Sequence, residues 1–208
     1  MDAGDAIQGA PVGTLSEGGY IIDIMNQTGY DVAVPGNHEF DYGMPRFLEL
    51  AGKLNCGYYS CNFISTASGQ SVFAPYKMIS YGDTQVAYVG VSTPESFTKS
   101  TPAYFQDANG NYIYSFCEDA DGTAFYNQVQ SAVDSAEGAE FVILVGHLGE
   151  NGITERWSAG SLIGHIRGVD ACIDGHSHET TLSMIVKDAD GKDVIVTQTG
   201  TKLANIGK

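Results

Sequence analysis

The pattern of apolar and polar residues switches along this chain between the period of two that strands show and the longer period that helices show. Apolar runs predict strands at residues 31–35, 57–61, 76–81, 85–91, 141–145, 169–173, 181–187 and 193–199. Helical patterns lie between several of these runs, at residues 44–54, 123–136 and 154–166. Apolar strands that alternate with helices indicate an α/β fold.

The N-terminal segment, residues 7–29, is predicted to be a loop followed by a helix. Thr14 or Ser16 would cap this helix, and Gly29 would end it. Its apolar stripe would consist of Tyr20, Ile21, Ile24 and Met25. We therefore expect an amphipathic helix early in the chain, after a loop.

Residues 92–122 are rich in Ser, Thr, Asp, Asn and Gly, and we interpret them as a long surface excursion. Residues 107–111 and 119–122 superficially resemble calcium-binding loops. Neither has the Glu that closes an EF-hand loop at its twelfth position. Hairpin turns are the favoured interpretation of both.

The sequence has 208 residues, enough for one domain with a buried core. Acidic residues number 25 and basic residues 10, so the formal net charge is −15. This balance argues against binding DNA or RNA polymers through a basic face. Only three arginines occur. A protein of this kind that handles phosphate would need metal ions or helix N-termini to attract the anion.

Features of membrane and secreted proteins are absent from the sequence. No apolar run reaches the roughly 18 residues of a membrane span, and the first residues lack the basic and apolar regions of a signal peptide. The four cysteines show no Cys-x-x-Cys spacing, and we expect small buried thiols rather than a disulfide framework. These cysteines are Cys56, Cys61, Cys117 and Cys172.

Three predicted strands end in a Gly that is followed by His or by Asn-His. Asn37 and His38 follow the strand at 31–35, His147 follows the strand at 141–145, and His176 with His178 follows the strand at 169–173. Open α/β sheets bind their ligands beyond the carboxyl ends of strands. We therefore expect these side chains, together with Asp5, to meet at one edge of the sheet.

Imidazole, carboxylate and amide oxygen together suit divalent ions such as Zn, Mn, Fe or Co. No cysteine joins the set, which argues against a closed structural zinc site. His176 and His178 lie two positions apart and so share one side of an extended segment. Taken alone, each motif also fits a capped or polar turn, with Asn37 as a helix N-cap for example. His165 lies in a helical pattern, and we assign it to packing or to the surface.

Four motifs in order resemble those of the calcineurin-like metallophosphoesterases, and the resemblance covers essentially the whole chain. They are Gly-Asp-Ala-Ile-Gln-Gly at 4–9, Gly-Asn-His-Glu-Phe-Asp-Tyr-Gly at 36–43, Gly-His-Leu-Gly at 146–149 and Gly-His-Ser-His at 175–178. The second motif is similar to that of the 5′-nucleotidase and 2′,3′-cyclic nucleotide phosphodiesterase branch. The resemblance implies a four-layer αββα sandwich with two mixed sheets.

The resemblance also implies a two-metal hydrolase, in which metal-bound hydroxide attacks a nucleotide phosphate in line. The implied ligands are Asp5, which would bridge the two ions, then Asn37, His147 and His176 for one ion and His178 for the other. His38 would not be a ligand but would meet the phosphate or the leaving oxygen, oriented by Asp41. We expect Glu39 to be structural.

The chain departs from the family pattern at its start, because the Asp-x-His strand that supplies two further ligands is missing. We therefore expect residues 1–208 to be a single metallophosphoesterase domain, incomplete at the N-terminus and without the C-terminal domain that binds the nucleobase. One metal site would be well supplied, whereas the second would keep only Asp5 and His178. Activity of this chain alone would be weak or absent. The family suggests a secreted, periplasmic or cell-surface protein.

Two other functions remain open at this stage. The first is a non-catalytic remnant of the fold that binds a metal or a partner, inactive because one site lacks ligands. The second is a calcium-binding surface protein, based on the acidic balance and the Asp- and Asn-rich turns. Without such a role, the acidic surplus is an ordinary solvated surface.

Overall fold

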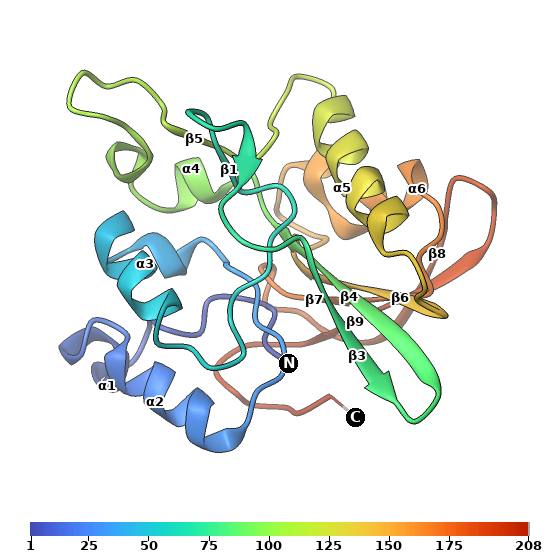
Figure 1. Cartoon of the computed structure of the whole chain (residues 1–208), viewed down its shortest axis with the longest axis horizontal. Coiled ribbons are helices and arrows are strands. Elements are labelled where there is room, and N and C mark those ends of the chain that lie inside the picture. Colours follow the sequence, from blue (N-terminus) through green and yellow to red (C-terminus); the bar gives the residue numbers. More distant parts are fainter. Residues whose placement is uncertain (208) are drawn as a thin grey trace.

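A six-stranded mixed sheet forms the centre of the molecule in the computed structural model, which describes residues 1–207 (Figure 1). Its strands, in spatial order, are β3 (Tyr76–Tyr81), β4 (Thr84–Ser92), β6 (Phe141–His147), β7 (Ala171–Asp174), β9 (Asp193–Thr199) and β8 (Thr180–Lys187). The four inner strands are parallel, and β3 and β8 pair antiparallel at the two edges. The predicted mixed α/β architecture is confirmed.

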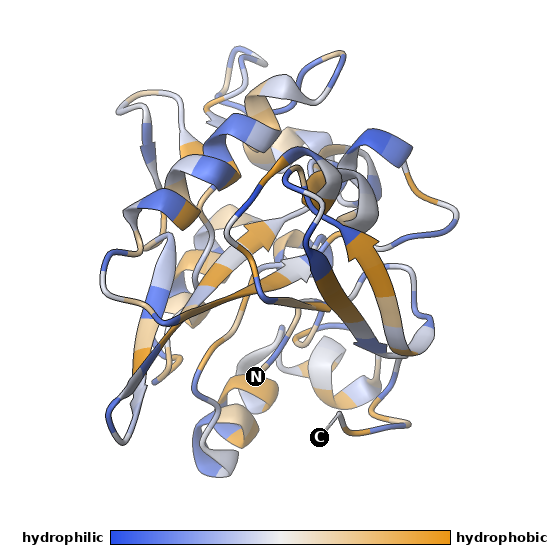
Figure 2. Ribbon diagram, turned by 90° about the vertical axis from the view of Figure 1, so that its right-hand side faces the viewer, coloured by the Kyte–Doolittle hydropathy of each residue, from blue (hydrophilic) through white to orange (hydrophobic). Residues whose placement is uncertain are grey.

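Helices α5 (Thr123–Ser135) and α6 (Ala159–His165) cover one face of this sheet. Alternation along β4 explains how both faces are buried. Ala87, Val89 and Val91 pack in the cluster that includes these helices, whereas Val86 and Tyr88 pack on the opposite side. In Figure 2, orange apolar segments accordingly run through the strands in the middle of the molecule, and blue segments mark the outer helix turns.

A second layer lies against the opposite face. Val32 and Val34 pack there against β4 and β6, and parallel bridges join Asp2 to Ala33 and Ala33 to Tyr58. The strands predicted at 31–35 and 57–61 are therefore present only as single bridges. A small three-stranded sheet follows the second of these segments. It consists of β1 (Ile64–Ser65), β2 (Gln70–Ser71) and β5 (Tyr114–Ser115).

Three helices pack beyond this second layer, which gives the layer order that the family resemblance implied (Figure 1). They are α1 (Pro11–Leu15), α2 (Gly19–Thr28) and α3 (Met44–Ala51). The core between them is aromatic. Phe40 lies at its centre, with ring centroids 4.9 to 5.8 Å from those of Phe47, Phe63, Phe105 and Phe116. This cluster holds the segment that immediately follows Asn37 and His38.

The remaining elements are short. They are η1 (His38–Phe40), α4 (Ser96–Lys99), η2 (Pro102–Phe105) and η3 (Glu155–Trp157). Residues 92–122 are largely irregular, as predicted, although α4, η2 and β5 lie within them. The prediction that they form a surface excursion is wrong in part, because Phe105 and Phe116 are fully buried in the aromatic core. Asp107 accepts the backbone N–H groups of Asn109 and Asn111 with one carboxylate oxygen, which is a turn rather than an EF-hand.

The N-terminal helix differs from the prediction. Residues 7–29 contain two helices, because Gly18 adopts a φ of 82° between them. Ser16 caps neither helix, although its hydroxyl accepts the N–H of Tyr20. The predicted stripe is also wrong in part, since Tyr20 and Ile24 are exposed while Ile22 and Met25 are buried. Gly29 ends α2 with a φ of 79°, as predicted.

All four cysteines are free thiols in the structure, in agreement with the sequence analysis. Cys117 is half-buried and the other three are buried. Among residues 1–207, no helix combines the length and the apolar character needed to cross a bilayer.

Candidate metal centre

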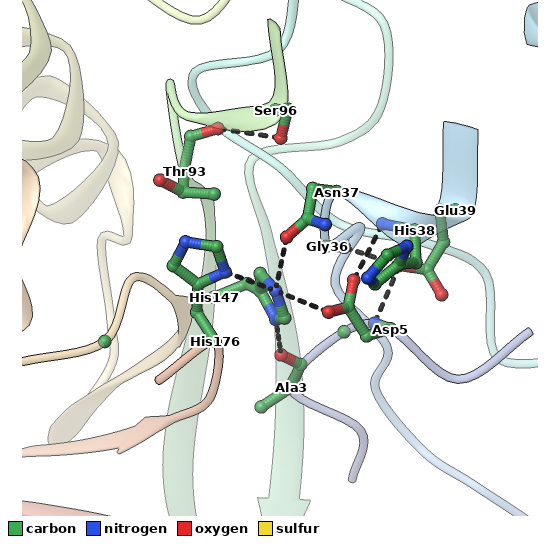
Figure 3. Close-up of polar contacts among 12 residues, drawn as sticks. Ala3, Asp5, Gly36, Asn37, His38, Glu39, Thr93, Ser96, His147 and His176 are labelled. Atoms are coloured by element: carbon green, nitrogen blue, oxygen red, sulfur yellow. Dashed lines mark hydrogen bonds and ion pairs between the residues drawn. The ribbon is translucent and has the colours of Figure 1, made fainter. Parts of the chain in front are cut away.

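The register of the central sheet brings the functional segments together. Ser92 at the end of β4 pairs with His147 at the end of β6, and Val145 pairs with Ile173 on β7. Because these strands are parallel, the segments that follow them leave the sheet at one edge. The loops that carry Asp5 and Asn37 reach the same edge from the second layer (Figure 3).

Four potential ligand atoms converge around Nε2 of His147. Oδ2 of Asp5 lies 3.1 Å from this nitrogen, Nδ1 of His176 lies 3.2 Å away, and Oδ1 of Asn37 lies 3.3 Å away. Asp5, His147 and His176 each offer one ligand atom, all within 4.8 Å of one another. His147 and Asn37 are almost fully buried, whereas Asp5 and His176 are partly buried.

The outward nitrogen of each histidine has its own partner. Nδ1 of His147 donates to the carbonyl of Ala3 at 2.6 Å, and Nε2 of His176 donates to Oε2 of Glu95 at 2.9 Å. These contacts fix the tautomers, so that the inward nitrogens present lone pairs. One carboxylate oxygen, one amide oxygen and two imidazole nitrogens therefore face a common point, a donor set that fits a single divalent cation.

The electrostatics of this group favour positive charge. Burial alone would raise the pKa of Asp5, but His147 and the backbone N–H of His38 hold it far below its usual value. Burial lowers the pKa of His147, but the Asp5 carboxylate outweighs this effect and raises it to about 9. Burial and His147 together lower the pKa of His176 to about 4. Without a cation, His147 therefore carries a second proton that faces Asp5, whereas His176 is neutral. Because a metal ligand must be deprotonated, a divalent cation would displace that proton from Nε2 of His147.

Unusual backbone conformations place these ligands. Asp5, His176 and His178 have φ values of 67°, 78° and 59°, a region that residues other than Gly and Asn rarely adopt. Gly4 has a φ of 92°, and a Cβ there would come within 2.6 Å of Nδ1 of His147. Gly4 therefore permits the close approach between the first loop and the buried histidine.

Glu39 joins the two loops that carry Asp5 and Asn37. Its fully buried carboxylate accepts the backbone N–H groups of Asp5 and Gly36, both at 2.7 Å, and of Ala6 at 2.8 Å. Burial raises its pKa, and the Asp5 carboxylate raises it further. These contacts support the structural role expected for Glu39 from the sequence.

His38 and Asp41 form a pair beside the ligand group. Nδ1 of His38 and Oδ2 of Asp41 lie 2.6 Å apart, and the other Asp41 oxygen accepts the hydroxyl of Ser100 at 3.2 Å. The hydrogen bond to Asp41 raises the pKa of His38 against the effect of partial burial. Because Nδ1 is occupied, the free ring nitrogen of His38 is Nε2.

A cavity of about 280 Å³ opens over the ligand group. Its walls are formed by Asp5, Asn37, His38, Lys99, Asn151, Gly152, Ile153, His176, Ser177 and His178. His178 is exposed on this wall and is not part of the close ligand group. The cavity therefore brings together a cation-binding group, a histidine that can donate a proton and a lysine.

The structure brings together the four residues expected for the well-supplied site and places His38 with Asp41 next to them. His165 lies elsewhere, exposed and stacked on Tyr126 with a centroid distance of 4.2 Å, as the sequence analysis assigned it. Sequence reasoning gave no role to Glu95 or Lys99. The histidines were identified as polar residues just beyond the end of a strand. The same criterion could have identified Glu95, which follows β4.

Comparison with known proteins identifies the fold and the motifs together. Residues 1–180 match the calcineurin-like phosphoesterase family. The chain belongs to this family. Calcineurin-like phosphoesterases are hydrolases, and residues 1–180 include the convergent ligand group.

Two similar sequences and one similar solved structure agree with this assignment. The chain is 30% identical over 188 residues to a 5′-nucleotidase from Bos taurus, covering 86% of this chain and 29% of the relative. It is 28% identical over 222 residues to a snake venom 5′-nucleotidase from Gloydius brevicauda, covering 95% and 34%. The solved structure of a 5′-nucleotidase precursor from Thermus thermophilus matches with a TM-score of 0.74 and 25% identity, covering 95% of this chain and 38% of that one.

The phosphoesterase chain thus spans about a third of the length of the relatives that it matches.

Proposed function

We propose that this chain is a metal-dependent phosphoric ester hydrolase domain of the 5′-nucleotidase type, which removes phosphate from a nucleotide. The observation that carries the proposal is the convergence of Asp5, Asn37, His147 and His176 in one cavity with the His38–Asp41 pair. Cation ligands and a proton donor beside one another are what the hydrolysis of a phosphate ester needs.

Asp5, Asn37, His147 and His176 would hold one divalent cation. When bound, such a cation acts as a Lewis acid toward phosphate oxygen and lowers the pKa of water. A second cation would have Asp5 and His178 as ligands from this chain, and we infer that two ligands give it the weaker site. Zn, Mn, Fe and Co all suit these donor atoms.

His38 would supply the proton in the reaction. Water attacks phosphorus on the side opposite the ester oxygen, and the bond from phosphorus to that oxygen breaks. The leaving oxygen then takes the proton from Nε2 of His38, while Asp41 holds the ring through Nδ1 and stabilises its cationic form. This assignment uses His38 as an acid and leaves it outside the ligand set.

Two features support a nucleotide as the substrate. Several relatives are named as 5′-nucleotidases, and Lys99 lies on the cavity wall. In a chain with a net charge of −15, a lysine ammonium and a bound cation are the groups available to attract a phosphate. The relatives named as venom proteins also favour a secreted setting for the full protein.

Phosphate release from p-nitrophenyl phosphate and from AMP tests the proposal, with the purified chain and added Mn²⁺ or Zn²⁺. Because the second cation site has only two ligands from this chain, we expect weak release that EDTA abolishes and that His38→Asn reduces without changing Mn²⁺ affinity. Metal binding with no release from either ester, under conditions where the chain is folded, would instead support the non-catalytic remnant of the fold. No binding of a transition metal would contradict the proposal altogether.

A further inference from the structure

We propose that Glu95 is a positioning residue that fixes the orientation of the His176 ring, so that Nδ1 rather than Nε2 faces the cation. The same carboxylate connects His176 to the loop that carries Thr154. The inference rests on the proposed function, because it concerns the geometry of the same centre. Glu95 belongs to none of the motifs that identify the ligands, and it lies on the segment after β4.

The first observation is the contact between Glu95 and His176. Oε2 of Glu95 lies 2.9 Å from Nε2 of His176, and the two side chains are only 8% and 6% exposed. The opposite ring nitrogen, Nδ1, lies 3.2 Å from Nε2 of His147, within the ligand group. A carboxylate on one ring nitrogen fixes a proton there and leaves the lone pair on the other. Nδ1 is therefore the nitrogen that can bind a cation.

The second observation is that the other oxygen of Glu95 is occupied as well. Oε1 accepts the backbone N–H of Thr154 at 2.7 Å and its hydroxyl at 2.6 Å. The backbone of Glu95 is also held, since its N–H donates to the hydroxyl of Thr93 and Ser96 donates to the Thr93 carbonyl (Figure 3). With both oxygens and the backbone engaged, the carboxylate has one orientation, and it transmits that orientation to the His176 ring.

The third observation concerns the loop that precedes Thr154. Asn151, Gly152 and Ile153, which precede Thr154, line the cavity. Glu95 therefore connects the cavity wall, where a substrate would lie, to a ligand of the cation. A histidine that is tied to a carboxylate is also a stronger base toward a metal, so the same contact would increase the affinity for the cation.

Calorimetric titration with Mn²⁺ and Zn²⁺ tests the proposal on four chains: wild type, Glu95→Gln, Glu95→Ala and the surface control Glu137→Gln. Loss of a carboxylate behind a metal-bound histidine typically weakens binding by about 10- to 100-fold. We expect a loss of that size for Glu95→Ala, a smaller loss for Glu95→Gln, which keeps one acceptor oxygen, and no change for the control. Thr154→Val, which removes one of the two donors to Oε1, should fall between Glu95→Gln and the wild type.

Nitrogen-15 spectra of the histidine rings in the metal-free protein provide a readout that does not depend on activity or on metal. Wild type should show His176 protonated at Nε2, and Glu95→Ala should show a mixture of both tautomers. The proposal is overturned by a folded Glu95→Ala chain that binds Mn²⁺ as the wild type does. It is equally overturned by a wild-type His176 that carries its proton on Nδ1. A wild type that binds metal but hydrolyses no ester would contradict the proposed function, whereas the positioning role of Glu95 would remain supported by the binding data.

Discussion

The carboxylate of Glu39 accepts the backbone N–H of Asp5 at 2.7 Å across 34 positions of sequence. The same carboxylate accepts the N–H of Gly36 at 2.7 Å. The N-terminal loop and the loop with Asn37 are therefore joined by one buried side chain, and the ligand atoms that they carry are held at a fixed separation.

Replacing this side chain tests the relationship. In Glu39→Gln the amide keeps one acceptor oxygen but points its NH₂ group at backbone donors. A buried donor left without an acceptor costs about 1–3 kcal/mol. We expect a lower midpoint of urea denaturation and weaker Mn²⁺ binding, both measured against Glu137→Gln. An unchanged midpoint together with unchanged binding would show that Glu39 does not hold the two loops.

His38 is expected to matter for the reaction and not for metal binding. His38→Asn removes the proton donor, and the rate of ester hydrolysis should fall by about 10²- to 10⁴-fold. Calorimetry should give the same Mn²⁺ affinity as the wild type, because the ring of His38 is outside the ligand group. Asp41→Asn, which keeps the ring but weakens its orientation, should give a smaller loss of rate. A His38→Asn chain that lost its metal would move His38 into the ligand set.

Lys99 should act on substrate binding. Removing its ammonium in Lys99→Ala should raise KM for AMP several-fold and leave kcat nearly unchanged, because the charge contacts phosphate before and during the reaction alike. Added salt should reduce the difference between the variant and the wild type. Lys187→Ala serves as the matched control, since Lys187 pairs with Asp193 on the β8–β9 hairpin. Equal KM values for Lys99→Ala and the wild type would remove Lys99 from the substrate site.

The number of cations bound should reflect the ligands that the chain supplies. Titration with Mn²⁺ should show one tight site and one site that is weaker by at least an order of magnitude. Asp5→Ala should abolish both sites, whereas His178→Ala should affect the weaker one alone. Two equal tight sites in the wild type would contradict this assignment of ligands.

The aromatic cluster should determine how stable the site loop is. Phe40 is fully buried among four other phenylalanine rings. Truncating such a side chain in Phe40→Ala should cost about 3–5 kcal/mol in the free energy of unfolding. Leu182→Ala, at a site that is 90% exposed, should change it by less than about 0.5 kcal/mol. Chemical denaturation followed by circular dichroism measures both changes.

Much of the fold followed from local pattern, because the strands of the central sheet are apolar runs with clear turns between them. The predicted bounds of β3 and β9 agree with the structure. Pro75 and Gly82 flank β3, and Gly-containing turns flank β9. The segment at 7–29, predicted as a loop and one helix, contains two helices. A glycine at positive φ divides it, and the packing of Gly18 against Ile7 and Leu50 is a tertiary contact that no helical period reveals.

The proximity of Asn37, His147 and His176 followed from their positions, because residues at the ends of parallel strands lie at one edge of the sheet. What surrounds the ligands did not follow. Glu95 contacts His176 across 81 positions, and Ala3 contacts His147 across 144. Such partners depend on how the loops close over the edge of the sheet, which the pattern of single segments does not specify.

The ligand atoms come from loops near both ends of the chain, from Asp5 to His176, and local contacts alone cannot bring them within reach. A partly folded chain therefore lacks the assembled ligand group, and we expect a cation to bind tightly only after the long-range pairing of the sheet is complete. Metal uptake by this protein would accordingly report when folding has finished. A time-resolved titration during refolding would show binding as the last event rather than as the nucleus of the fold.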